Sequence, residues 1–195
     1  MKFTQIPADT FQHLQLNAGV LLKSFDPNTA TLNKSDIIGA TSGGVQFTAS
    51  PSYSDWGEDI DNCPTNVKEL KKLDGWEVSM SGTYLTVSAS QAKDLIGAAD
   101  IDSSDPTHII PRNDVLEGDF ADIWWVGDYS DKNGATNGGF IAIHLLNGLS
   151  TGGFQMQSAN KGKGNFSFEI TGHYSIDDTE KVPFEVFVKS GSAEA

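Results

Sequence analysis

Residues 165–176, NFSFEITGHYSI, alternate between apolar and polar side chains. On an extended backbone the apolar residues fall on one face (Phe166, Phe168, Ile170, Tyr174, Ile176) and the polar residues on the other (Ser167, Glu169, Thr171, His173, Ser175). A period of two residues is typical of a strand with one buried and one solvated face. The segment therefore predicts a long, half-buried strand.

Four other segments are strand-like. Residues 76–87 alternate in the same way, and residues 184–189, FEVFVK, supply a last strand. Residues 123–126, IWWV, and 140–146, FIAIHLL, are apolar on both faces, as central strands are. Glycine, serine and threonine are frequent and helical periodicity is scarce, so the chain is expected to be β-dominated.

One α-helix is predicted, over Ser88–Gly97, SASQAKDLIG. Ser88 is a good N-cap with Gln91 three residues later, and Gly97 is a typical stop. A long loop is predicted over about residues 50–74, after a short strand near residues 45–49, because this polar run shows little periodicity. Loops of this length are usually functional or ordered by a partner. The ends, about residues 1–11 and 190–195, are expected to be arms on a single domain spanning residues 1–195.

The composition is strongly acidic. Asp and Glu number 26 against 13 Lys and Arg, which gives a formal net charge of -13. Such a surface repels phosphate, so ordinary nucleic-acid binding is disfavoured. With Cys63 as its one cysteine the chain cannot form an intrachain disulfide. It has no membrane-spanning apolar run and no signal-peptide pattern at its start, so we expect synthesis in a cytoplasm and no contact with a membrane.

Sequence motifs for catalysis, phosphate binding or metal binding are weak throughout the chain. The KGKG run at residues 161–164 lacks the Ser or Thr that must follow Gly-Lys in a phosphate-binding loop, so a turn between strands is expected there. The acidic cluster Asp55, Glu58, Asp59 and Asp61 lacks the EF-hand order and is interpreted as a solvated loop. His144 lies in an apolar strand and is interpreted as a core histidine. No catalytic, cofactor-binding or metal-binding residue is assigned, and the chain is not expected to be an enzyme or to need a cofactor.

The polar faces of the best strands carry Ser, Thr, Gln and occasional Glu, but almost no Lys or Arg. We hypothesise that the sheets pair between subunits into a closed ring, with this face lining a channel that a polyanion passes without sticking. The alternative is an ordinary solvated sheet face. The residues expected to face the lumen are Glu77, Ser79, Ser81, Gln155, Gln157, Ser167, Glu169 and Thr171.

Four stretches carry a family resemblance: residues 43–83, GGVQFTASPSYSDWGEDIDNCPTNVKELKKLDGWEVSMSGT; residues 119–157, DFADIWWVGDYSDKNGATNGGFIAIHLLNGLSTGGFQMQ; residues 162–176, GKGNFSFEITGHYSI; and residues 182–191, VPFEVFVKSG. They resemble the major tail (tail tube) proteins of long, non-contractile-tailed bacteriophages and prophages of Gram-positive bacteria. The resemblance implies a β-sandwich or half-barrel with one flanking helix. Six copies would form a ring, and stacked rings would form the virion tube that delivers DNA into the host.

The resemblance also implies partners: further copies of the chain, the tape measure, tail terminator and distal tail proteins, and double-stranded DNA that passes without specific binding. Assembly would take place in the bacterial cytoplasm. The arms and the long loop would bridge neighbouring rings. Residues expected at contacts between subunits or rings are Trp56, Asp59, Asp61, Lys161 and Lys163.

Two alternatives stay open at this point. The inner tube of a contractile injection system shares the same subunit plan. A carbohydrate-binding β-sandwich would use Trp124, Trp125 or Trp56 as a sugar platform.

Overall fold

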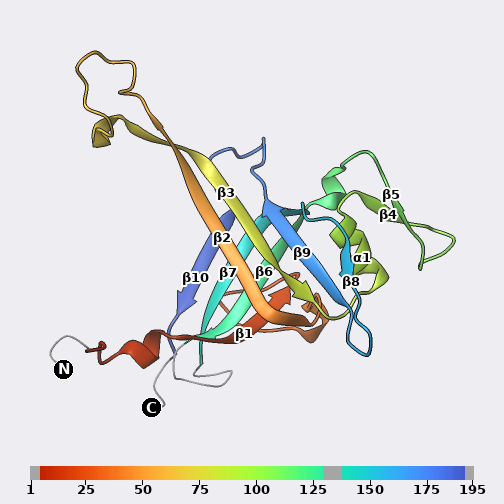
Figure 1. Ribbon diagram of the computed structural model, residues 1–195. Coiled ribbons are helices and arrows are strands. Elements are labelled where there is room, and N and C mark those ends of the chain that lie inside the picture. The colour runs from red at the N-terminus through yellow and green to blue at the C-terminus, as the bar shows by residue number, and fades with distance from the viewer. Residues whose placement is uncertain (1–4, 130–137, 192–195) are drawn as a thin grey trace.

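The computed structural model describes residues 5–129 and 138–191, which form antiparallel sheets beside one α-helix (Figure 1). An eight-stranded sheet contains β1 (Gln15–Leu22), β2 (Thr41–Asp55), β3 (Lys71–Tyr84), β6 (Ala121–Tyr129), β7 (Gly139–Ser150), β8 (Gln155–Gln157), β9 (Asn165–Gly172) and β10 (Phe184–Lys189). A small second sheet pairs β4 (Ala99–Ile101) with β5 (Ile109–Pro111). The predicted β-dominated fold with one helix is confirmed for the described residues.

Strand β7 joins the two halves of the large sheet. It pairs with β6 and β10 along most of its length, and with β9 through Leu149 and Ser150 at its end. The half made of β1, β6, β7 and β10 packs against the half made of β2, β3, β8 and β9. Their shared core brings together Trp125 and Leu145 from the first half with Met80 and Phe168 from the second. The arrangement is a sandwich.

The outer side of the first half is also buried. Phe25, in the segment after β1, lies 5.7 Å from Trp124 and 5.3 Å from Phe140, measured between ring centroids. Leu22, Val126 and Ala142 also belong to this second cluster. Strands β6 and β7 are therefore covered on both faces, as their doubly apolar sequences predict.

Helix α1 (Ala89–Ile96) forms as the sequence predicts. The Ser88 hydroxyl accepts a hydrogen bond from the Gln91 N–H at 3.2 Å, and the Gln91 side-chain oxygen accepts one from the Ser88 N–H at 2.8 Å. Gln91 also donates to the Ile38 carbonyl at 2.6 Å, which ties the helix to the segment before β2. Gly97 ends the helix with φ of 84°. Short 3₁₀ helices are η1 (Thr10–His13), η2 (Lys34–Asp36), η3 (Lys68–Leu70) and η4 (Glu117–Asp119).

The loop predicted over residues 50–74 is wrong in its bounds. Strand β2 runs to Asp55 and β3 begins at Lys71, so the connection is residues 56–70, and the two strands form a long hairpin that projects from the body (Figure 1). Residues 51–53 and 71–74 are exposed on both faces. These residues lie beyond the core, so their sequence has no alternating pattern that would predict strands there.

Strand β9 is shorter than predicted, because it ends at Gly172. Tyr174 lies beyond it and accepts a hydrogen bond from the Trp76 N–H at 3.0 Å, while Ile176 is 93% exposed instead of buried. The predicted arms are described only for residues 5–11 and 190–191, where Ile6 and Phe11 are exposed. Their remaining residues, like residues 130–137 between β6 and β7, lie outside the described part.

Candidate functional site

One face of β2, β3, β8 and β9 is polar throughout the sheet. Cross-strand pairs place Ser79 opposite Thr171, Ser81 opposite Glu169, and Gln155 opposite Ser167. This polar sheet face comprises Gln46, Thr48, Ser50, Glu77, Ser79, Ser81, Thr83, Gln155, Gln157, Ser167, Glu169 and Thr171. All eight residues predicted to face a lumen lie on it, although they come from three separate stretches of sequence.

The opposite face of the same strands holds these side chains in register. Val78, Met80, Phe166 and Phe168 alternate with the polar residues and are at most 9% exposed. A slip of one residue in β3 or β9 would bury the polar side chains and expose the apolar side chains. The core therefore determines which residues reach the polar sheet face.

Sequence analysis missed the part of this face contributed by β2. Gln46 lies opposite Ser81, Thr48 opposite Ser79, and Ser50 opposite Glu77. The alternation in VQFTAS was the available signal. This alternation predicts a short strand, and the same period places Gln46, Thr48 and Ser50 on one face of it.

The polar sheet face carries negative charge and lacks positive charge. Glu77 and Glu169 are exposed on it, and the described residues that form it include no lysine or arginine. The lysines of β3 are Lys71 and Lys72, at the far end of the hairpin, where they pair with Asp55 and Ser54 of β2. A phosphate moving along this face would meet no fixed cation, so the face has no strong hold on a polyanion.

The strand register separates the predicted contact residues into two groups. Tyr84, the last residue of β3, lies opposite Phe166 at the start of β9, so the preceding turn with Lys161 and Lys163 lies at that end of the sheet. Asp59 and Asp61 lie beyond the other end of β3, which is 14 residues long. At about 3.3 Å per residue, this strand alone separates the two groups by roughly 45 Å. The predicted turn at KGKG is confirmed, with Lys161 at φ of 56°.

The hairpin tip, residues 56–70, is organised by Asp55. Its carboxylate accepts hydrogen bonds from the N–H groups of Gly57, at 3.0 Å, and Asn66, at 2.8 Å. These bonds lower the pKa of Asp55 below its ordinary value. Asp55 thus helps to close the loop, a role that the sequence did not indicate, whereas Glu58, Asp59 and Asp61 are exposed. Trp56 is 61% exposed.

The remaining candidate residues are buried or bonded within the subunit. Trp124 and Trp125 are buried, so neither offers a platform to a sugar. His144 stacks on Trp124 with ring centroids 3.9 Å apart and lies between the carboxylates of Asp122, at 3.1 Å, and Glu185, at 3.4 Å. This is the partnered histidine that the sequence indicated. Within the described residues, no three His, Cys, Asp or Glu side chains are grouped as metal ligands would be.

Comparison with models of known protein families finds no match, and comparison with curated proteins finds none either. No helix of the described residues is long and apolar enough to cross a membrane. The chemistry of the polar sheet face and of the hairpin tip therefore carries the functional argument.

Proposed function

We propose that this chain is the structural subunit of a tube, with six copies closing into a ring and rings stacking into a virion tail that conducts double-stranded DNA. The observation that carries the proposal is the polar sheet face. It is continuous across four strands, and it presents hydroxyls, amides and two carboxylates without a cation. A channel wall of this composition lets a polyanion slide, because phosphates find no lysine or arginine to hold them.

Ring closure requires strand edges that another copy can pair. Strand β2 pairs with β3 on one side, and within the described residues no strand pairs with its other edge. The other edge of this half is formed by the short strand β8, whose three residues pair with β9. Long unpaired edges favour association with another strand, and closing the sheets into a barrel removes them.

The stacking of rings is supported by the opposite charges at the two ends of the subunit. The hairpin tip is rich in carboxylates at one end of β3, and Lys161 and Lys163 lie at the other end. A contact between unlike ends of two copies is heterologous, and a heterologous contact that does not close on itself propagates into a filament. Opposite charges at these ends steer the copies into one orientation.

In this proposal the chain has no catalytic residue and needs no cofactor. Its partners are further copies of itself, the tape measure, tail terminator and distal tail proteins, and DNA in transit. The inner tube of a contractile system would use the same face. A carbohydrate-binding module is disfavoured, because two of its three proposed platforms, Trp124 and Trp125, are buried.

Negative-stain electron microscopy of the purified chain at high concentration tests the proposal. Hollow rings or tubes of uniform width are expected. A monodisperse monomer that forms neither rings nor tubes over a series of concentrations and salt conditions would overturn it.

A further inference from the structure

Two strips of exposed apolar side chains lie at opposite edges of the subunit. The first, the β8 strip, consists of Phe154 and Met156, which are 44% and 61% exposed. Met156 lies opposite the core residue Phe166 of β9, and the ring centroids of Phe154 and Phe166 are 6.0 Å apart. Both side chains of the strip therefore lie on the apolar side of the sheet, away from the polar sheet face, and overhang the core at its edge.

The second strip, the β10 strip, consists of Val186 and Val188, which are 49% and 55% exposed. They follow Phe184 at intervals of two residues, so all three side chains lie on one side of β10. The Phe184 ring lies 5.6 Å from the Phe47 ring of β2, so this side faces the half of the sheet that contains β2. Strand β10 then runs on past the edge of β2 that no described strand pairs with (Figure 1), which leaves the two valines uncovered.

The pleat of the strands determines which way the β8 strip faces in a ring. In the ring that we propose, the polar sheet face continues from one copy to the next, so Gln155 of one β8 continues the polar side chains of the neighbouring β2, such as Gln46. Successive side chains of a strand point to opposite faces. Met156 must then lie on the same side as Phe47, which is the side on which β10 lies.

Strand direction and register agree with this contact. Strands β2, β3, β9 and β8 alternate in direction, so the β8 of the next copy runs antiparallel to β2. Met156 lies opposite Phe166, which lies opposite Tyr84, and Tyr84 lies opposite Thr41, so β8 is level with the beginning of β2. Strand β10 runs away from the hairpin tip toward that same end (Figure 1). The two strips are therefore at similar levels of the subunit.

We propose that the β8 strip of one copy covers the β10 strip of the next copy, so that neighbouring subunits of a ring share a small hydrophobic core. This inference rests on the proposed function and names the side chains that hold the ring together. Strand β8 has only three residues and can form few main-chain bonds to β2, so the burial of these four side chains supplies most of the stability of the joint. The contact is heterologous, and repeating it around an axis closes a ring.

The composition of the two strips suits a buried contact. The centre of a protein interface is depleted in charge and enriched in aromatic residues and methionine. Neither strip contains a charged residue. Glu185 lies on the other side of β10, where its carboxylate contacts His144 at 3.4 Å, so covering the β10 strip does not bury this carboxylate in the joint.

Aspartate variants test the joint. Met156→Asp and Val186→Asp should each raise the concentration at which rings or tubes appear in electron micrographs by about tenfold or more, because each places a charge in every joint of the ring. Thermal unfolding of the monomer should change little, since both side chains are exposed in it. Val115→Asp makes the same change in charge at an apolar residue that is 50% exposed in the segment before η4, and it should assemble like the unmodified chain.

Cross-linking tests which surfaces meet. In a Cys63→Ser background, Met156→Cys combined with Val186→Cys should give a ladder of covalent oligomers when assembled material is treated with a short bismaleimide. Either cysteine variant alone should give no ladder, because the contact joins unlike surfaces. Val115→Cys combined with Val186→Cys is the matched control and should give none.

The outcomes separate this inference from the proposed function. Rings that form normally from both aspartate variants, or rings that give no ladder with the Met156→Cys and Val186→Cys pair, would overturn the joint and leave the tube in place. An unmodified chain that forms no rings would overturn the tube and the joint together.

Discussion

Lys72 places its ammonium nitrogen 4.2 Å from the centre of the Trp56 ring, at the distal end of the β2–β3 hairpin. A cation over an exposed indole contributes about 0.5–1 kcal/mol, so the contact orients Trp56 without burying it. Trp56 stays 61% exposed, and it is therefore not folded into the core of its own subunit. An oriented, exposed aromatic side chain loses little entropy when a partner covers it.

Trp56→Ala is expected to weaken the stacking of rings and to leave the subunit folded. The free energy of unfolding should change by less than about 1 kcal/mol, because the side chain is largely exposed and its contact with Lys72 contributes no more than that. Thermal unfolding measures the stability of the subunit, and electron microscopy measures the stacking of rings. Ile176→Ala removes an apolar side chain that is 93% exposed, and it serves as the control for a general loss of surface apolarity. Normal tube formation by Trp56→Ala would show that the hairpin tip does not anchor stacking through this residue.

Reversing the charges of the turn between β8 and β9 tests the contact between unlike ends of two subunits. Lys161→Glu combined with Lys163→Glu should impair assembly, because the turn would then repel the acidic hairpin tip of the next copy. The remaining assembly should also depend less on salt, since the screened attraction is gone. Light scattering over a salt series measures both effects. Lys34→Glu combined with Lys181→Glu makes the same change in net charge elsewhere, and an equal effect of this pair would mean that net charge alone governs assembly.

Adding cations to the polar sheet face should make it hold DNA. Ser79→Lys combined with Ser167→Lys supplies partners for phosphate where none exist, so the assembled protein should retain double-stranded DNA at low salt and release it at high salt. Co-sedimentation measures the retention. Ser103→Lys combined with Asn113→Lys adds the same charge near the small second sheet. DNA retention by this control, or by the unmodified protein, would contradict a role for the cation-free face.

Local patterns predicted the parts of the fold in which one side is buried. The alternation in β9 identified Ser167 and Glu169 as surface residues, and the Ser88–Gln91 pair marked the start of α1, because both patterns act within a few residues. The end of the hairpin escaped prediction, since residues 51–53 and 71–74 have no buried side and thus no alternation. There the pairing of one strand with the other, and not contact with the core, maintains the extended backbone.

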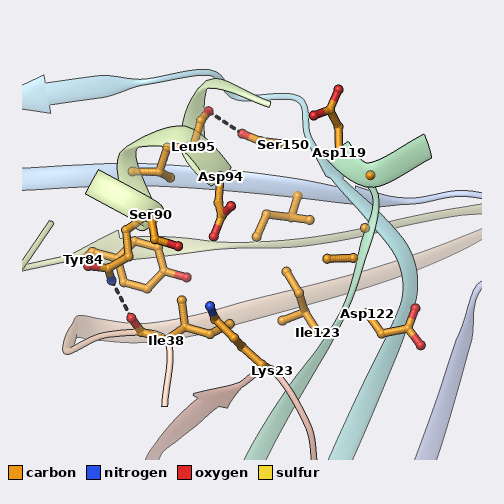
Figure 2. Close-up of a pocket in the computed structure, with 15 residues that line it drawn as sticks. Lys23, Ile38, Tyr84, Ser90, Asp94, Leu95, Asp119, Asp122, Ile123 and Ser150 are labelled. Carbon is orange, nitrogen blue, oxygen red and sulfur yellow. Dashed lines mark hydrogen bonds between the residues drawn. The ribbon is translucent and has the colours of Figure 1, made fainter. Parts of the chain in front are cut away.

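The cavity between α1 and the sheet, which Lys23, Tyr84 and Asp94 help to line (Figure 2), escaped prediction for a different reason. Lys23, Tyr84 and Asp94 come from the segment after β1, from the end of β3 and from α1. No spacing in the sequence relates them, and packing of the helix on the sheet brings them together. The polar sheet face was accessible from sequence because each of its strands carries the same period, whereas a cavity between elements has no period to detect.

The pH dependence of the hairpin tip should follow Asp55. Its pKa is lowered in the folded state by the N–H groups of Gly57 and Asn66, so its contribution to stability is fully present above the ordinary value of 3.8. This contribution is lost as the pH falls below 3.8 and through the lowered pKa of the folded state. Hydrogen exchange of the Gly57 and Asn66 amides should therefore become faster than the general pH dependence of exchange predicts in this acidic range, before the body of the sandwich unfolds.

Two variants distinguish this local effect from general acid unfolding. Asp55→Asn cannot ionise, and it keeps only one acceptor oxygen where the carboxylate uses two, so at least one of the two amides should lose protection at neutral pH, and neither should show a separate acid transition. Asp59→Asn removes an exposed carboxylate of the same tip and should leave the transition in place. If the Gly57 and Asn66 amides kept their protection in Asp55→Asn, the loop would be closed by its own backbone, and the Asp55 carboxylate would contribute nothing to the shape of the surface that we propose meets the next ring.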